Sequence, residues 1–563
     1  MQAETRNCQN CKNQFTIEPD DFSFYETIHV PPPAWCPECR LIRRLSWQGY
    51  RMFYKRKCDF TGDEVITTHH PADEHKVYRQ DVWWSDKWDP KEFGRDYDFS
   101  RSFFEQFQEL MKAVPFPALY TEHSKMVNSD YCNAASQLKN CYLCFRITKG
   151  EESGYVNTIV DIKNCFDLSF SNFCELSYDS VRLNKCYQAF YSQDCDDCHD
   201  IWFSRDLAGC SNCIGCVNLR NKNYYIFNKP YPKEEYEKFF EELKLDSRKR
   251  VQEFKEKISM TALRYPRRQF HGRKNIEVTG DYVFNSKNVR DSYMLSNGEN
   301  LRYCQFLKVG PTANCYDYSI FSDGAEWVYE SCWVGLRAHN IKFSSWDYTV
   351  HDVEYSFGCH GSENLFGCVG IKNSAYCIFN KQYSKDKYKE IVDRIKRQMS
   401  KVPYIDQLGR GHGYGEFFPS ALSPWAYNES TAYELFPLSK ENALARGFRW
   451  RDPDSREYQD ASIEVPDHIR DVSKTILKEI LKCEKCGKNY QLIQKEFEFY
   501  KRYNIPIPVK CPLCRDRERI GLLNPMKIFE RKCMKCGTAI TTNYAPDRPE
   551  IVYCEQCYNA EVA

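Results

Sequence analysis

The two ends of the chain carry the same arrangement of cysteines. Each end has a Cys-x2-Cys pair, 24 intervening residues and a second Cys-x2-Cys pair. The members are Cys8, Cys11, Cys36 and Cys39 near the start and Cys483, Cys486, Cys511 and Cys514 near the end. Every cysteine of the first set lies 475 positions before its counterpart, and other residues match at this spacing without a gap from about residue 8 to 83. We expect one module at each end of the chain, duplicated and then diverged.

Each of these cysteine sets suits a zinc ion. Two Cys-x2-Cys turns supply four thiolates, which complete the tetrahedral shell that zinc prefers. Because a full shell leaves no open position, such a site is structural and not catalytic. Disulfides are the alternative. They are disfavoured because the first residues contain no apolar secretory segment and Cys-x2-Cys pairs rarely oxidise in the cytosol.

A second cysteine set distinguishes the two modules. The C-terminal copy adds Cys533, Cys536, Cys554 and Cys557. In the N-terminal copy Cys58 survives, but Thr61, Arg79 and Val82 stand at the other three positions. One thiolate cannot hold zinc, so an aromatic cluster formed by Tyr78, Trp83, Trp84 and Trp88 is expected to replace the metal there. The sequence therefore predicts three zinc ions.

The middle of the chain is duplicated as well. Residues 215–236 match residues 367–388 at a constant spacing of 152. Short runs rich in Tyr, Phe, Cys and Ser alternate with Asn, Asp and Gly, and cysteine motifs recur 21 and 24 residues apart. A coil of about 20–24 residues is typical of a β-solenoid, with Asn at the turns and Cys stacked inside. We predict a right-handed parallel β-helix, with a β-sandwich of short strands as the alternative.

The fold class that follows is mainly β, a central duplicated β-solenoid flanked by zinc-ribbon modules with a few capping helices. Helices are expected where acidic residues follow Pro232 and Ser384, in a short stretch from Ser439 to Gly447, and from Pro466 to Leu481. The predicted domains are an N-terminal zinc-ribbon module (1–98), a helical linker (99–126), a first solenoid lobe with a capping helix (127–260), a second such lobe (261–400), a Pro- and aromatic-rich connector with a helix (401–482) and a C-terminal double zinc-ribbon module (483–563).

Charge and hydropathy exclude some classes of protein. No apolar stretch approaches 18 residues, so no membrane span is expected. The formal net charge is +1, so affinity for nucleic acid would have to come from a local patch. We expect a cytoplasmic protein with reduced cysteines.

A basic patch of this kind follows the second Cys-x2-Cys pair. Its candidate nucleic-acid-binding residues are Arg40, Arg43, Arg44, Trp47, Arg51, Lys55, Arg56 and Lys57, and no acidic residue interrupts them. Cationic side chains beside aromatic rings can hold phosphates and stack bases. A solvated surface that keeps the protein soluble is the alternative explanation.

Other motifs have structural explanations. The sequence from Cys195 to His199 matches a covalent haem signature, but the corresponding residues of the second lobe lack both cysteines. The series Cys210, Cys213 and Cys216 resembles part of an iron–sulfur motif without its fourth cysteine, which favours a buried ladder. The His-Asp pairs that begin at His199 and His351, present in both lobes, fit turn-stabilising roles. No catalytic residue is predicted.

Four segments carry a family resemblance. They are the sequences that begin at Cys36 (Cys-Pro-Glu-Cys-Arg-Leu-Ile-Arg-Arg), Arg56 (Arg-Lys-Cys-Asp-Phe-Thr-Gly), Trp83 (Trp-Trp-Ser-Asp-Lys-Trp-Asp-Pro) and Glu416 (Glu-Phe-Phe-Pro). With them the chain resembles uncharacterised bacterial zinc-ribbon proteins of candidate phyla. The resemblance covers most of the chain and implies zinc ribbons that flank a repeat region, without an implied activity.

The function predicted from these observations is that of a non-enzymatic zinc-binding protein. Its terminal ribbons would contact RNA or a ribonucleoprotein, and the solenoid would be a rigid scaffold. One alternative is a β-helix enzyme acting on a glycan or a sugar nucleotide, and another is a scaffold for protein–protein interactions.

Overall fold

The structure is a computed structural model that describes residues 2–452 and 458–562. It divides into two compact units. Unit 1 comprises Met1–Leu119, Phe270–Asp452 and Met526–Ile528, and unit 2 comprises Tyr120–Gln269, Pro453–Pro525 and Phe529–Ala563. Unit 1 therefore combines the N-terminal module with the second lobe, and unit 2 combines the first lobe with the C-terminal module. Each module belongs to the unit of the lobe that is farther from it in sequence.

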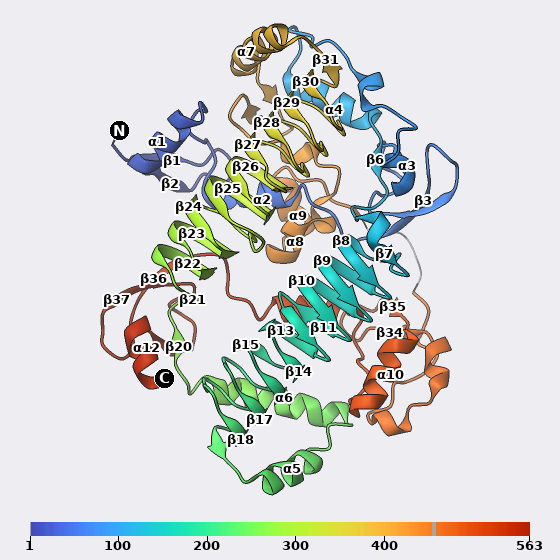
Figure 1. Ribbon diagram of the computed structural model, residues 1–563, viewed down its shortest axis with the longest axis vertical. Helices are drawn as coiled ribbons and strands as arrows, with labels where there is room; N and C mark the ends of the chain where they lie inside the picture. Colours follow the sequence, from blue (N-terminus) through green and yellow to red (C-terminus); the bar gives the residue numbers. More distant parts are fainter. Residues whose placement is uncertain (1, 453–457, 563) are drawn as a thin grey trace. The chain divides into compact units, whose positions relative to one another are not determined.

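The first lobe is a parallel β-solenoid whose short strands stack as a ladder (Figure 1). Its strands are β7 Met126–Val127, β8 Asn133–Lys139, β9 Tyr142–Glu151, β10 Gly154–Lys163, β11 Phe166–Ser169, β12 Asn172–Glu175, β13 Tyr178–Asn184, β14 Tyr187–Phe190, β15 Gln193–Asp196, β16 His199–Trp202, β17 Ser211–Ile214, β18 Asn223–Ile226 and β19 Lys229–Pro230. Paired residues are twelve positions apart, as in Gly154 with Phe166 and His199 with Ser211. One coil therefore contains twelve residues.

The backbone of this lobe turns at every third residue. From Ala134 to Phe227 each third residue has a positive φ, and Gly209 and Gly215 occupy two of these corners. Left-handed backbone is unfavourable for most residues but tolerated by Asn, Asp and Gly, which explains why these residues recur in the sequence. Four such corners complete one coil of twelve residues.

The residue after each corner faces the interior. The interior consists of Cys, Val, Leu, Ile and Ala side chains, among them Cys165, Leu168 and Cys174. Buried serines complete it: the Ser204 hydroxyl donates to the Trp202 carbonyl and accepts from the Cys216 N–H of the next coil. Polar groups inside the narrow solenoid are thus paired from coil to coil.

The second lobe repeats this design. Its strands are β21 Gly272–Arg273, β22 Ile276–Phe284, β23 Lys287–Ser296, β24 Gly298–Arg302, β25 Thr312–Ser322, β26 Ala325–Gly335, β27 His339–Lys342, β28 His351–Glu354, β29 Glu363–Phe366, β30 Ala375–Ile378 and β31 Lys381–Gln382. The register is again twelve in most of the lobe and widens where Gly298 pairs with Thr312 and Thr312 pairs with Ala325. Its interior contains Val, Leu, Ile and Cys in the same positions.

These ladders confirm the predicted duplicated β-solenoid, but the predicted coil length was wrong. Spacings of 21 and 24 residues are multiples of the three-residue side, and 24 residues make two coils. The cysteines of the first lobe, from Cys132 to Cys216, are all separated by multiples of three. That spacing is the signal that would have given the shorter coil.

Helices follow each lobe as expected. After the first lobe come α5 Lys233–Glu242 and α6 Arg248–Ala262, and after the second comes α7 Lys385–Lys401. The linker contains α4 Phe103–Ala113, whose Phe103 packs on Tyr355, Phe366 and Phe379 of the second lobe. In unit 2, α6 takes the corresponding place, with Phe254 against Phe203 and Phe227.

The two modules share one sequence of elements. In the N-terminal module these are β1 Glu4–Asn7, β2 Gln14–Ile17, α1 Pro19–Thr27, α2 Pro37–Leu45, β3 Tyr54–Lys57, β4 Glu64–Thr67, β5 Val77–Tyr78 and α3 Gln80–Trp83. The C-terminal module has β34 Leu481–Lys482, β35 Asn489–Tyr490, α10 Gln494–Tyr503, α11 Pro512–Ile520, β36 Phe529–Lys532, β37 Ala539–Thr542, β38 Val552–Tyr553 and α12 Glu555–Val562. In each, the two-residue strand near the end pairs with a strand that precedes a lobe: β5 with β6 Phe116–Pro117, and β38 with β20 Arg267–Arg268.

The connector follows α7. It contains β32 Tyr404–Ile405, β33 Gly411–His412, the 3-10 helices η3 Ser420–Leu422 and η4 Tyr427–Glu429, and α8 Thr431–Leu435. The short helix predicted after Ser439 is α9 Lys440–Ala445. The helix predicted from Pro466 to Leu481 was wrong, because only the 3-10 turns η5 Ile469–Asp471 and η6 Lys474–Lys478 form there. None of the helices in residues 2–452 and 458–562 is long and apolar enough to cross a bilayer.

Candidate metal centres

The structure brings the N-terminal cysteines together. Cys8 and Cys11 lie at the turn between β1 and β2, while Cys36 caps α2 and Cys39 lies in its first turn. Their four sulfur atoms lie within 4.8 Å of one another, and Cys11 Sγ is 3.8 Å from Cys36 Sγ. Zinc–sulfur bonds of about 2.3 Å in a tetrahedron place sulfurs about 3.8 Å apart, so the tetrad has the size and the donors for such an ion.

The C-terminal module holds two more tetrads, at the positions expected. Cys483, Cys486, Cys511 and Cys514 form one, in which Cys486 Sγ lies 3.7 Å from Cys511 Sγ. Cys533, Cys536, Cys554 and Cys557 form the other, in which Cys536 Sγ lies 3.8 Å from Cys554 Sγ. All twelve predicted metal ligands therefore fall into three groups that could each hold a metal ion.

Backbone hydrogen bonds favour thiolates in these tetrads. The N–H of Cys36 donates to Cys8 Sγ at 3.2 Å, and the N–H of Cys554 donates to Cys533 Sγ at the same distance. Burial raises the pKa of Cys483, but hydrogen bonds from its neighbours' N–H groups outweigh it and lower that pKa to about 7. Deprotonated sulfur is the form that binds metal.

The half-module around Cys58 keeps its fold without a second tetrad. The N–H of Arg79 donates to Cys58 Sγ at 3.2 Å, as the N–H of Cys554 does to Cys533 Sγ in the other module. Cys58 packs with Val65 and Val77 in a small apolar cluster. Of the predicted aromatic cluster, Trp83 and Trp88 are buried with ring centroids 5.9 Å apart, Tyr78 is 5.5 Å from Trp88, and Trp84 is 43 % exposed.

In unit 1 the helix α2 is docked on the second lobe through buried arginines. Arg40 Nη2 lies 2.8 Å from Asp317 Oδ2, and Arg44 Nη1 lies 2.9 Å from Asp317 Oδ1. Arg44 Nε donates to Ser319 Oγ at 3.3 Å, and Arg44 Nη1 lies 3.1 Å from Glu330 Oε1. Both side chains of the Arg44–Asp317 pair are 0 % exposed, so the helix is fixed at that point in a dry interior.

The docking of α11 on the first lobe in unit 2 has the same contacts. Arg519 corresponds to Arg44; its Nη1 lies 2.9 Å from Asp167 Oδ1 and its Nε donates to Ser169 Oγ at 3.1 Å. Arg515 corresponds to Arg40 and lies 3.0 Å from the same carboxylate. The lobes present an Asp-x-Ser sequence at both places. Duplicated modules thus use duplicated contacts on two different lobes.

Aromatic residues reinforce both docking sites. In unit 1, Phe24 stacks on Tyr316 with ring centroids 3.8 Å apart, and Tyr25 lies 5.5 Å from Tyr329. In unit 2, Phe499 lies 5.1 Å from Phe166 and Tyr500 lies 5.4 Å from Tyr178. Such ring pairs add to the free energy of burial.

Burial dominates the electrostatics of these interfaces. Desolvation alone would lower the pKa of Arg40, but Asp317 raises it well above the usual value. Burial raises the pKa of Glu330, although Arg43 and Arg44 oppose the shift. Each buried ion here needs a partner of opposite charge, because burial of an unpaired ion has a large cost in free energy.

The structure corrects the expectation that the Arg40–Lys57 segment is an exposed basic surface. Arg40, Arg43, Arg44 and Trp47 are each at most 1 % exposed, and the three arginines bond to carboxylates of their own unit. The reason is that acidic partners absent from the local sequence arrive from the second lobe.

The remaining members of that segment lie nearer the surface. Arg51 and Arg56 are half-buried, with Arg51 Nη1 3.3 Å from Glu434 Oε1. Lys55 and Lys57 are exposed on β3, and Lys55 Nζ lies 2.9 Å from Glu64 Oε1. Binding of RNA through the segment as a whole is therefore not supported.

The cysteine motifs inside the first lobe form a ladder. The thiols of Cys210, Cys213 and Cys216 donate to backbone carbonyls of their own coils. Asp200 and Asp352 of the two His-Asp pairs occupy left-handed corners with φ of 55° and 54°. Both observations match the structural roles expected for these motifs.

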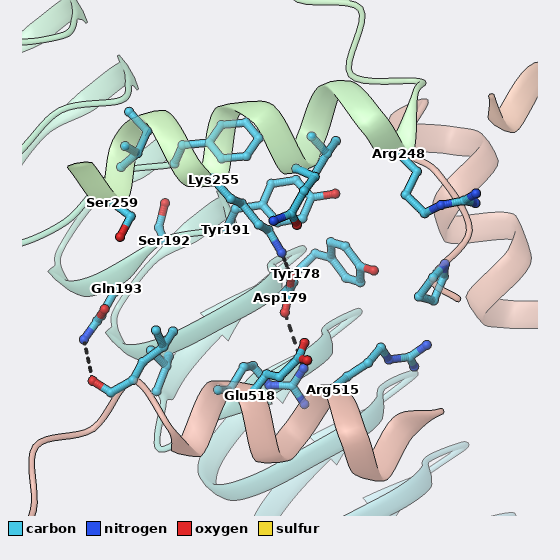
Figure 2. Close-up of a pocket in the computed structure, with 18 of the residues that line it drawn as sticks. Tyr178, Asp179, Tyr191, Ser192, Gln193, Arg248, Lys255, Ser259, Arg515 and Glu518 are labelled. Atoms are coloured by element: carbon cyan, nitrogen blue, oxygen red, sulfur yellow. Dashed lines mark hydrogen bonds and ion pairs between the residues drawn. The ribbon is translucent and has the colours of Figure 1, made fainter. Parts of the chain in front are cut away.

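Unit 2 contains a cavity that the sequence does not predict. It has a volume of about 900 Å³ and lies between α6, α11 and the strands of the first lobe (Figure 2). Lys255 reaches from α6 to an ion pair with Asp179, whose other oxygen lies 3.4 Å from Arg519 Nη1. Its apolar lining includes Val181, Phe203, Ile258 and Leu522. No sequence motif marks it, because its walls come from three separate segments.

Comparisons with known proteins add little. No family model matches the chain, and no curated protein matches it. Among solved structures, it is similar to a putative acetyltransferase from Desulfovibrio desulfuricans G20, at 9 % sequence identity and a TM-score of 0.10, over 49 % of this chain and 86 % of that one.

Proposed function

We propose that the protein is a non-enzymatic, zinc-binding scaffold, in which zinc-stabilised ribbons hold two solenoid lobes in shape for the binding of other proteins. The observation that carries the proposal is the burial of Arg40 and Arg44 against Asp317, matched by Arg515 and Arg519 against Asp167. The ribbon face that would read a nucleic acid is used to bind the solenoid instead.

Zinc is the metal that this donor set favours. Four thiolates with sulfur–sulfur distances near 3.8 Å match tetrahedral zinc, and a complete sulfur shell leaves no position for a substrate. The ion would fix the N-terminus of α2 or α11, from which the docking arginines project one to two turns later. Metal binding would in this way stabilise the contact between ribbon and lobe.

The scaffold proposal is preferred to an enzyme because the aspartates of the first lobe are used structurally. Asp197 and Asp200 are corner residues, and Asp206 lies 2.9 Å from the Arg267 guanidinium. Corner aspartates point along the outside of a solenoid, and a paired one is not poised for proton transfer.

The proposal is tested by metal analysis combined with hydrogen exchange. Purified protein should contain three zinc ions per chain. Removal of zinc by a chelator should increase the amide exchange of α2 and α11 and of the solenoid strands β11 and β25 that contact them. The ladder strands β29 and β17, remote from these contacts, are the internal control and should exchange as before.

Two results would overturn the proposal. One is a content well below three zinc ions with full protection of α2 and α11. The other is salt-dependent binding of single-stranded RNA that is lost in a Lys55→Glu, Lys57→Glu variant, which would show that the exposed lysines of β3 bind nucleic acid.

A further inference from the structure

A segment of the connector fills a gap in unit 1. Phe418 lies between α4 and the residues that follow α2, with its ring 4.9 Å from Phe107 and 4.5 Å from Trp47. The N–H of Phe417 donates to Glu330 Oε2 at 3.2 Å, and both phenylalanines are fully buried. The connector therefore inserts an aromatic pair where helix, ribbon and lobe meet.

The preceding residue completes the insertion with a charge. Glu416 Oε2 lies 2.9 Å from Arg43 Nη1, and Glu416 Oε1 accepts a hydrogen bond from the N–H of Ala34. Tyr414 adds a ring 6.0 Å from that of Phe343 on the lobe. The segment is thus bound by three kinds of group: an apolar slot around Phe418, the carboxylate of Glu330, which accepts from its backbone, and the cation of Arg43.

The cavity of unit 2 is the counterpart of this filled gap. The duplications relate five residues of unit 2 to equivalent positions of unit 1. Ile258 corresponds to Phe107, Leu522 to Trp47, Phe203 to Tyr355, Tyr191 to Phe343 and Asp179 to Glu330. All five unit 2 residues line the cavity. The walls that hold the connector in unit 1 are therefore present in unit 2.

Among the described residues of unit 2, none takes the place that the connector has in unit 1. In unit 1 the connector follows α7, whereas the corresponding helix α5 of unit 2 ends at Glu242 and α6 begins at Arg248. The space remains as a cavity of about 900 Å³, open between α6 and α11 (Figure 2). The connector segment of unit 1 is therefore a template for the kind of group that such a space receives.

The differences between the walls define the occupant. Glu518 stands where unit 1 has Arg43, so a basic residue would replace the Glu416 of the connector. Ile258 and Leu522 are smaller than Phe107 and Trp47, which leaves room for a full aromatic side chain. Glu518 is 40 % exposed and lies 2.8 Å from Lys510 Nζ and 3.3 Å from Lys485 Nζ, so an incoming cation can replace these surface partners.

We propose that the cavity between α6, α11 and the first lobe binds an extended peptide segment of a partner protein, with an aromatic residue two positions after a basic one. The aromatic ring enters the slot of Ile258, Leu522 and Phe203, a backbone N–H donates to Asp179, and the basic residue meets Glu518. This inference rests on the proposed scaffold function and names the partner's chemistry.

The test uses the connector itself as the probe. Two fluorescent peptides span residues 411–426, one with the natural sequence and one carrying Glu416→Lys, and their binding to the full-length protein is measured by anisotropy at low and physiological salt. We expect the Glu416→Lys peptide to bind at least about tenfold more tightly than the natural one, because only it complements Glu518. A Glu518→Arg protein should reverse this order.

Control variants separate the cavity from the rest of the unit. Ser259→Trp places an indole at the cavity wall and should abolish binding, whereas Met260→Trp, on the next residue of α6 and 68 % exposed, should not change it. Glu498→Arg, on the exposed face of α10, has the same charge change as Glu518→Arg and should leave the order of the peptides intact.

Several outcomes would refute the inference. They are failure of both peptides to bind, equal binding to the Ser259→Trp protein, or an order that Glu518→Arg does not alter. Retention of three zinc ions in the same samples would show that the scaffold proposal survives such a failure. Co-purification of a small molecule that Ser259→Trp excludes would also overturn it, because the cavity would then be a small-molecule site.

Discussion

Substitution of Arg44 by methionine would remove one side of the buried ion network that docks α2 on the second lobe. Methionine has a similar length and is apolar, so the change deletes the charge without opening a large cavity. It leaves Asp317 paired with Arg40 and Glu330 paired with Arg43, and it removes the donor to Ser319 Oγ.

The magnitude follows from the burial of the partners. Removing one member of a fully buried pair typically costs about 3–5 kcal/mol, since the other charge stays in a dry interior. Because both carboxylates keep a second arginine, we expect a loss near the lower end, about 3 kcal/mol. The exposed pair of Lys55 and Glu64 gives the scale for comparison, because a surface pair contributes less than about 1 kcal/mol.

Urea unfolding followed by hydrogen-exchange mass spectrometry measures this loss, because peptides report each unit separately. Arg44→Met should lower the midpoint for peptides of unit 1 and leave those of unit 2 unchanged, and Arg519→Met should do the reverse. A double variant of Arg44→Met with Asp317→Asn should lose less than the sum of the single losses, since the orphaned carboxylate is also removed.

The outcome that contradicts this reasoning is a small effect. If Arg44→Met costs no more than Lys55→Met, the network contributes no more than a surface pair. Equal effects on both units in the Arg44→Met protein would show that the ion network is not local to the docked helix.

Three further results are expected. Cys11→Ser should reduce the metal content by one ion in elemental analysis and raise the exchange of α2. Burial lowers the pKa of His75 to about 4, so the unfolded chain takes up a proton below about pH 6.5 that the folded chain refuses. The free energy of unfolding should fall by about 3 kcal/mol between pH 6.5 and 4, and less in His75→Gln, as urea titrations at the two pH values will show. Burial raises the pKa of Asp347 well above its usual range. The free energy of unfolding therefore falls as the pH rises from about 4 towards that pKa. The Asp347→Cys variant, which has the residue found at the equivalent position Cys195 of the first lobe, should be more stable than the wild type at pH 8 in the same titration.

Much of the architecture was readable because metal ligands and turns have strict local requirements. The three tetrads follow from cysteine spacing alone, since few other arrangements satisfy four thiolates. The solenoid followed from the alternation of compact apolar residues with Asn, Asp and Gly. Its coil length was missed because the inward positions repeat every three residues, so several longer periods fit the cysteines equally well.

The docking of the ribbons could not be predicted from local sequence. From the local sequence Arg44 is interpreted as an exposed phosphate ligand, because its acidic partners Asp317 and Glu330 lie more than 270 residues away in the chain. Nor does the sequence say which lobe each module binds, since both lobes carry the Asp-x-Ser site that begins at Asp317 in one and Asp167 in the other. Only the folded structure shows that each module binds the lobe that is farther from it in sequence. The cavity of unit 2 could not be predicted either, because its walls come from segments that are far apart in the sequence.

The crossed order of the modules has a consequence for synthesis and truncation. The N-terminal module is synthesised before Asp317, Glu330 and Glu416, which follow hundreds of residues later. The arginines of α2 therefore remain solvated until these partners have been made. Closing unit 1 means closing a loop that contains the whole first lobe, and unit 2 is complete only when Cys557 has been made. A cut between the lobes would therefore not yield two independent halves. It would separate each lobe from its ribbon. The docking arginines of α2 and α11, which are buried in the complete protein, would then be exposed.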